Sequence, residues 1–210
     1  MRIVSRVSLW GLCLFIWAGV AAAAPSSADI DAARAEYVEQ WEEYKRRFLL
    51  PDGRIEDTNE GTPSHVEGQG SAMIFATVAR DREAFDLIWG WTRDTLWERH
   101  GLFAWRYLPN EEVKVPDRNN ATDGDLLILW GLMRAAKLWD EPAFDEAADK
   151  IILGLERRAI FDVGERKVLL PGALAFRKDD GAILNLSYFL FEPIQWAMER
   201  RDNAIWRQTY

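Results

Sequence analysis

The sequence predicts an all-α fold built from two kinds of helix. Apolar residues recur every three or four positions through most of the chain, which is the period of an α-helix. Some of these segments are apolar on every side, as buried helices are, and the segments that follow them are apolar on one side only. Alternation with a period of two is confined to a short stretch near Lys167 to Leu170. We therefore expect two layers of helices, with the apolar set inside.

Composition narrows the class of protein before any motif is considered. The 210 residues are 49% hydrophobic and 29% charged, which is typical of a globular protein. The net charge of −8 argues against a nucleic-acid partner, because phosphate binding requires a basic surface. One cysteine and two histidines are too few for an internal disulfide or a standard zinc cluster, so we predict no metal and no cofactor.

Residues 1–24 have the pattern of a secretory signal peptide. Arg2 and Arg6 precede an apolar run over residues 7–20, and small residues ending at Ala24 supply a cleavage site. The run has about 14 residues, fewer than the ~20 that cross a membrane, although a retained membrane anchor is an alternative. We predict a periplasmic or secreted protein, with no stable membrane insertion once the signal peptide is cleaved.

The mature chain, from residue 25, begins with an amphipathic helix over residues 29–50. Asp29 is its candidate N-cap, and Pro51-Asp52-Gly53 ends it. Residues 68–79 and 123–139 are the predicted inner helices, because they are mostly apolar. The amphipathic segments 81–99 and 141–158 are the predicted outer helices. A last apolar helix is expected over residues 188–198, with a kink at Pro193.

Two further patterns bear on the packing of these helices. Ala84-Phe85-Asp86 recurs 59 residues later as Ala143-Phe144-Asp145, which suggests repeated pairs of an inner and an outer helix. A match of three residues also arises by chance, so both interpretations stay open. Most of the 11 Trp residues fall at helical spacing and are predicted to lie in the core. Examples are Trp89, Trp139 and Trp196.

Two polar loops place a carboxylate at the start of each predicted inner helix. Glu67 lies in the stretch Ser64-His65-Val66-Glu67-Gly68-Gln69-Gly70, and Asp123 lies between Asn119-Asn120 and Asp125. Helix capping is the simpler interpretation, because acids are favoured near a helix N-terminus. Capping does not require the neighbouring Asn, Gln and Gly, however. Both acids would lie at the same end of the inner helices and face one opening, as a carboxyl pair for glycosidic-bond hydrolysis does.

With these loops in place, the sequence resembles glycoside hydrolase family 8, the bacterial endoglucanases that include the periplasmic cellulase of cellulose-synthesis operons. The matching stretches occur in the family's order over residues 50–210. They are Gly53-Arg54-Ile55-Glu56-Asp57-Thr58, Glu67-Gly68-Gln69-Gly70, Asp81-Arg82, Phe85-Asp86, Leu102-Phe103-Ala104-Trp105-Arg106, Asn120-Ala121-Thr122-Asp123-Gly124-Asp125, Leu170-Pro171-Gly172 and Ser187-Tyr188.

The resemblance implies an (α/α)6 barrel that hydrolyses β-1,4-glucan (cellulose) with inversion. It assigns Glu67 as the general acid and Asp123 as the active-site aspartate, which holds the sugar at the cleavage point. As an acid, Glu67 must keep its proton near neutral pH, through burial or a nearby negative charge. Trp105 is the candidate sugar platform. Further candidate substrate-binding residues are Gln69, Asp125 and Tyr188. The implied partners are a β-1,4-linked polysaccharide and the cellulose-synthesis machinery.

The sequence also departs from the family pattern. Val66, Ser71-Ala72 and Leu186 replace the usual residues, which puts substrate contacts in doubt. The family's catalytic base has no counterpart before residue 210. We therefore expect residues 25–210 to be the N-terminal half of a catalytic domain, inactive and poorly stable alone because its open edges expose inner helices. The alternatives are a catalytically inactive glucan-binding protein, and a chitosanase or xylanase of the same fold.

Overall fold

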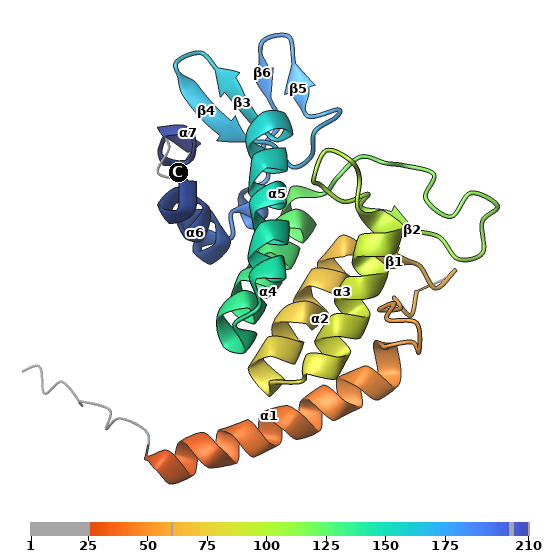
Figure 1. The fold of residues 1–210 in the computed structure, drawn as a ribbon. Coiled ribbons are helices and arrows are strands. Elements are labelled where there is room, and N and C mark those ends of the chain that lie inside the picture. The colour runs from red at the N-terminus through yellow and green to blue at the C-terminus, as the bar shows by residue number, and fades with distance from the viewer. Residues whose placement is uncertain (1–25, 60, 202–203, 210) are drawn as a thin grey trace, which may run out of the picture.

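The computed structural model describes residues 26–59, 61–201 and 204–209, so the predicted signal peptide lies outside the described residues. Helices dominate this part of the chain, which confirms the predicted helical fold (Figure 1). They are α1 (Ser27–Phe48), α2 (Val66–Ala79), α3 (Arg82–Leu96), α4 (Thr122–Trp139), α5 (Pro142–Arg158), the 3-10 helix η1 (Leu186–Tyr188), α6 (Phe191–Arg201) and α7 (Ala204–Thr209). Within these ranges no helix has the length and apolarity of a membrane span.

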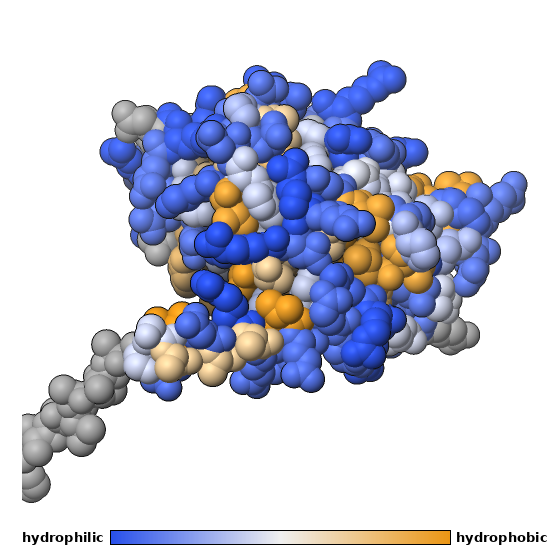
Figure 2. All heavy atoms as spheres, turned by 60° about the horizontal axis from the view of Figure 1, so that its bottom comes forward, coloured by the Kyte–Doolittle hydropathy of each residue, from blue (hydrophilic) through white to orange (hydrophobic). Residues whose placement is uncertain are grey.

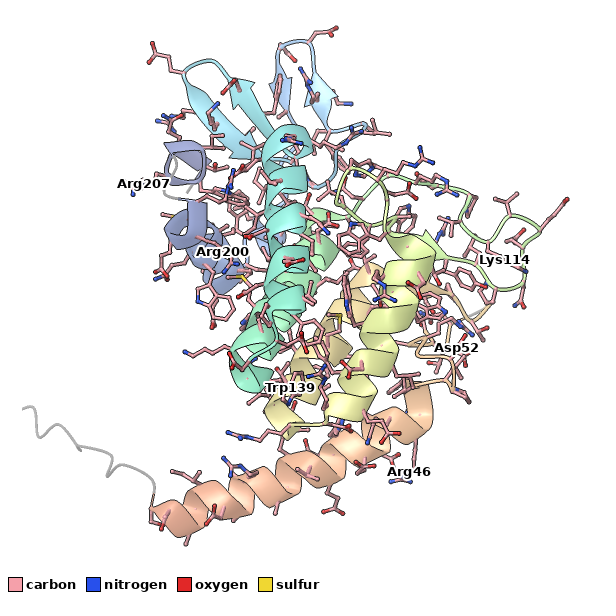
Figure 3. All side chains as sticks on the ribbon, in the orientation of Figure 1. Arg46, Asp52, Lys114, Trp139, Arg200 and Arg207 are labelled. Atoms are coloured by element: carbon pink, nitrogen blue, oxygen red, sulfur yellow. The ribbon has the colours of Figure 1, made fainter. Side chains whose placement is uncertain are left out.

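The helices form two layers. The inner helices α2 and α4 pack against each other, and α6 contacts α4. The outer helices α3 and α5 lie in front of α2 and α4 in Figure 1, and α1 crosses one end of this arrangement. Arg200 of α6 points toward α5 (Figure 3), where its guanidinium lies 3.2 Å from Asp145 and 2.5 Å from Asp149. The apolar segments are therefore the inner ones, as their composition predicts.

Glycines bring α2 and α4 into close contact. A Cβ atom at Gly124 would lie 2.1 Å from Cγ2 of Val66. A Cβ at Gly131 would lie 2.9 Å from Cβ of Met73, and Gly70 makes a similar approach to α4 from the opposite helix. Ordinary carbon contacts are about 3.5–4.0 Å, so any side chain at these positions would push the helices apart.

The repeated triplet occupies equivalent positions in the two outer helices. Phe85 lies in the first turn of α3 and Phe144 in the first turn of α5. Their ring centroids are 5.1 Å apart in an edge-to-face arrangement, and Arg82 lies 5.1 Å from the Phe144 ring. The two copies of the triplet therefore contact each other and link α3 to α5 in the outer layer.

Two helix termini differ from the prediction. Ser26, not Asp29, is the N-cap of α1, and Asp29 is the third helical residue of a reciprocal capping box. The last predicted helix is divided, because η1 ends at Tyr188 and α6 begins at Phe191. Pro193 therefore lies in the first turn of α6, where a missing N–H breaks no helical hydrogen bond.

Short antiparallel ladders, largely missed by the all-α prediction, cross the loops. β1 (Ser64–His65) pairs with β2 (Arg106–Tyr107), β3 (Ile160–Val163) with β4 (Arg166–Leu169), and β5 (Arg177–Lys178) with β6 (Gly181–Ala182). The stretch with a period of two, Lys167 to Leu170, falls mostly on β4, so that local signal was a strand signal. The β3–β4 and β5–β6 hairpins project beyond the ends of the helices in Figure 1.

The buried core contains fewer of the tryptophans than predicted. Trp89 is 6% exposed and lies in the core. Trp139 only borders the core, and Trp196 lines a surface cavity beside α6.

Apolar side chains remain exposed on the inner helices and beside them. On α2 the exposed ones are Phe75 and Val78, and on the other side of α4 they are Leu186 and Phe191. Apolar atoms also interrupt the hydrophilic surface in Figure 2.

Candidate active site

Glu67 and Asp123 lie together, each as the second residue of an inner helix. The charge of Glu67 raises the pKa of Asp123, so the two carboxyl groups lie close enough to interact. The start of α2 is fixed by the β1–β2 ladder and by the Val66 N–H, which donates to the Trp105 carbonyl at 3.1 Å. The side chain of Val66 packs against the backbone of Gly124, where an added Cβ would lie 2.1 Å from Val66 Cγ2, so the two helix ends approach each other closely.

The start of α4 is fixed by a different loop. Thr122 donates from its backbone N–H to the Pro171 carbonyl at 2.9 Å and from its hydroxyl to the Leu170 carbonyl at 2.6 Å. The Asn120 side chain accepts from the Ala173 N–H at 2.7 Å. The predicted family stretches around residues 120–125 and 170–172 therefore form one hydrogen-bonded unit that holds Asp123.

The carboxyl pair holds a proton near neutral pH. Burial and the negative charge of Glu67 raise the pKa of Asp123 to about 7, against the lowering effect of the hydrogen bond from the Gly124 N–H. A helix N-terminus favours a carboxylate, so at Asp123 burial and like charge outweigh the helix dipole. Asp123 can therefore carry a proton at a pH where an isolated carboxyl group is ionised.

A cavity of about 310 Å³ opens beside Glu67. Its walls are Tyr44, Phe48, Ile55, Glu56, Asp57, His65, Glu67 and Gly68. The Nδ1 atom of His65 lies 3.5 Å from a carboxylate oxygen of Asp57, and burial lowers the pKa of His65. Aromatic and polar groups around a carboxyl suit a polyol ligand such as a sugar.

Tyr44 and Phe48 were not predicted as site residues. Their helical spacing indicated only that they lie on the packing face of α1. No local signal revealed that the last turn of α1 borders the start of α2.

Tyr188 also reaches the pair. Burial together with the charges of Asp123 and Glu67 raises the pKa of its phenol. The candidate platform Trp105 lies next to His65, with ring centroids 5.8 Å apart, and donates from Nε1 to Asp117 at 2.9 Å. Both predicted aromatic residues are therefore near the start of α2 or α4.

Gln69 and Asp125 are not exposed to a ligand, which corrects the prediction that they bind substrate. Both side chains are fully buried. Gln69 accepts from the Ile55 N–H at 2.5 Å and donates to the Thr92 hydroxyl at 2.7 Å, so it ties the 53–55 loop to α2 and α3. Asp125 accepts from the Phe103 N–H at 2.9 Å and from Asn120 at 2.7 Å. Burial raises the pKa of Asp125 to about 7.

The fold and this site define a class of protein. The chain is a two-layer helical protein with a pair of carboxyls at the ends of neighbouring inner helices and a cavity beside it, an arrangement of the kind that glycosidic-bond hydrolysis uses. Among the described residues no three His, Cys, Asp or Glu side chains converge as a metal site would require.

The chain belongs to the glycosyl hydrolases family 8, whose sequence pattern matches residues 5–210. It is 45% identical to an endoglucanase of Cellulomonas uda over 168 residues, which cover 80% of this chain and 47% of the relative. It is 39% identical to a probable endoglucanase of Novacetimonas hansenii, over 88% of this chain and 54% of the relative.

The fold is similar to that of solved family members. The structure of endo-β-1,4-glucanase CMCax from Acetobacter xylinum superposes with a TM-score of 0.79 at 39% identity, covering 84% of this chain and 56% of that one. The chain thus spans about half the length of the relatives it matches.

Proposed function

We propose that this chain carries the acid side of the active site of an endo-β-1,4-glucanase, a cellulase that acts with inversion. The observation that carries the proposal is the pair of carboxyls at the starts of α2 and α4, electrostatically coupled and beside an aromatic-lined cavity. Family membership and the endoglucanase names of the relatives support the choice of β-1,4-glucan as substrate.

The electrostatic coupling of the two carboxyls argues for the division of roles. Burial and the charge of Glu67 raise the pKa of Asp123 to about 7, so Asp123 carries a proton over part of the neutral range. The base of an inverting pair must be ionised to take a proton from water. Asp123 is therefore poorly suited to act as that base.

Glu67 donates the proton to the leaving glycosidic oxygen. It borders the cavity, whereas Asp123 accepts a hydrogen bond from the Gly124 N–H and does not line that cavity. As the bond breaks, positive charge develops on the sugar ring, and the negative charge of the pair stabilises it. Asp123 keeps the proton on the pair until transfer and orients the acid. The base belongs to a part of the enzyme beyond residue 210.

The same proposal covers domain organisation and location. Residues 25–210 form the N-terminal half of the catalytic domain, and residues 1–24 direct export to the periplasm or the medium. The cellulose-synthesis machinery is the proposed partner in the cell. The intact mass of the native product from the exported fraction tests the first point. A mass clearly above the 24.2 kDa of these 210 residues supports it, and a smaller mass argues for the glucan-binding alternative.

Activity is tested on the native product with a soluble β-1,4-glucan, by counting new reducing ends. Glu67→Gln should lower the rate by about 10²–10⁴-fold, the contribution of a general acid. Glu39→Gln, an exposed acid on α1, is the charge-matched control and should leave the rate unchanged. Proton NMR of the fresh product should find the α-anomer.

Three results would contradict the proposal. A fully active Glu67→Gln variant would remove Glu67 from the acid role. Faster cleavage of chitosan or xylan oligomers than of cello-oligomers would favour the alternative substrates. Hydrolysis of glucan by the purified 210-residue chain would place the base within it.

A further inference from the structure

We propose that a cationic pocket on the outer layer binds an acidic saccharide, a sugar unit that carries a carboxylate. The pocket has a volume of about 510 Å³, within the range of ~300–1,000 Å³ found for small-ligand sites. It lies between α5 and the turn that follows α3, and Trp97, Arg99, His100, Lys150 and Arg157 contribute to its walls. Neither Glu67 nor Asp123 lines it.

Two buried glycines build the pocket. Gly101 has a φ of +88°, and a Cβ there would lie 2.4 Å from the Lys150 carbonyl oxygen. A Cβ at Gly154 would lie 2.7 Å from the carbonyl oxygen of His100. The turn closes with a hydrogen bond of 2.9 Å from the Gly101 N–H to the Glu98 carbonyl. The turn therefore packs directly on the backbone of α5. This packing places the basic residues of the turn beside those of the helix.

The positive charges in the pocket are not neutralised. Arg99, Lys150 and Arg157 are exposed, and no carboxylate of residues 26–59, 61–201 and 204–209 lies within 4.0 Å of their charged nitrogens. Glu98, the carboxylate in the pocket wall, pairs with Arg118 at 2.5 Å. In a chain with a net charge of −8, such a cluster attracts an anion from outside.

Helix electrostatics explains only part of this cluster. Basic residues in the last turn of α5, such as Arg157 and Arg158, complement the negative end of the helix dipole. Lys150 lies about two turns earlier, and Arg99 and His100 come from a different element. Arg158 also acts on His100, whose pKa is lowered by burial and then by that neighbouring charge. More basic residues therefore meet at the pocket than the dipole of α5 accounts for.

Trp97 indicates a sugar rather than a free anion. Its ring is only partly buried and stacks on Phe103, with centroids 5.6 Å apart and an interplanar angle of 29°. The Lys150 ammonium lies 5.9 Å from the ring centroid. An aromatic surface beside a cation matches a uronic acid, whose ring C–H groups lie on the indole while its carboxylate pairs with lysine or arginine.

The test is calorimetric titration of the native exported product with a β-1,4-linked tetramer of glucuronate, with cellotetraose and with inorganic phosphate. We expect binding of the acidic tetramer that weakens with salt. Lys150→Gln and Arg157→Gln should each weaken it by about tenfold, since each removes one charge-assisted contact. The matched controls Lys178→Gln and Arg166→Gln change exposed charges on the hairpins and should leave it within twofold.

The result is independent of the active site, because Glu67→Gln should bind the acidic tetramer as the unchanged chain does. Equal binding of cellotetraose would overturn the role of the carboxylate. Equal binding of phosphate would overturn the role of the sugar ring. The absence of heat at millimolar tetramer, or an equal loss in the control variants, would overturn the site itself.

Discussion

The contact between Gly124 and Val66 gives the sharpest prediction. Gly124→Ala places a methyl group where a Cβ would lie 2.1 Å from Cγ2 of Val66 and 3.2 Å from the Glu67 nitrogen. The first contact must lengthen by more than 1 Å to become an ordinary van der Waals contact. The substitution therefore acts directly between the two helix ends that carry the carboxyl pair.

The magnitude follows from two opposing effects. Alanine is favoured over glycine in a helix by up to about 1 kcal/mol, whereas overpacking a tight core costs about 1–3 kcal/mol. Gly90 on α3 isolates the first effect, because no atom lies within 4 Å of an added Cβ there. We expect Gly90→Ala to stabilise the chain slightly, and Gly124→Ala to be less stable than Gly90→Ala by about 1–3 kcal/mol.

Urea denaturation followed by circular dichroism measures this difference, and carboxyl-resolved NMR measures the second consequence. Separating the helix ends weakens the influence of Glu67, so Asp123 should titrate below its pKa of about 7 in the Gly124→Ala variant. Adding Val66→Ala should recover part of both effects. Equal stability of the two alanine variants, with Asp123 still titrating near pH 7, would refute the reasoning.

Three further predictions concern polar groups near helix ends. Asp125 has a pKa of about 7 in the folded chain and 3.8 in the unfolded chain, so the folded chain binds more protons between pH 3.8 and pH 7. The free energy of unfolding should therefore fall as the pH rises from about 4 to 7 and then level off. Urea denaturation across this range should find a smaller slope in Asp125→Asn, the lost part being at most about 4 kcal/mol. The charge of Asp123 raises the pKa of the Tyr188 phenol, so an ultraviolet titration should find a lower phenol pKa in Asp123→Asn; an unchanged phenol titration would remove Tyr188 from the site. Asp81 caps α3 and accepts hydrogen bonds from α1 at 2.6 and 2.9 Å. Asp81→Ala should therefore lower the free energy of unfolding, measured by thermal denaturation, by about 2–3 kcal/mol. The control Asp94→Ala, at an exposed ion pair, should lower it by less than about 0.5 kcal/mol.

Periodicity predicted the helices well and their ends less well. Every inner and outer helix was located, because burial of one face or of all faces leaves a repeating pattern in the residues. Asp29 was predicted as the N-cap of α1 because an acid is favoured both at the N-cap and at the third helical residue of a capping box. The apolar periodicity does not show which of the nearby polar residues lies just outside the helix. The two-residue ladders were missed because a strand of that length has no period.

The site was predicted in part for a similar reason. The loops singled out Glu67 and Asp123, because a polar, glycine-containing segment before an apolar helix is unusual. The same loops could not say which way each side chain points, so Gln69 and Asp125 were expected to face the ligand although both are buried. Val66, noted only as a departure from the family pattern, is the residue whose side chain sits against Gly124.

The glycine-lined contact of α2 and α4 also determines how the molecule can move. Helices that meet through their backbones cannot slide or tilt independently, so the two carboxyls should travel as one unit during fluctuations of the chain. Amide hydrogen exchange should be slowest in these two helices and fastest in the first turns of α1, where the side chains are exposed. Local opening of the outer layer would then leave the relative positions of the two carboxyls unchanged, and only unfolding of α2 and α4 would separate them.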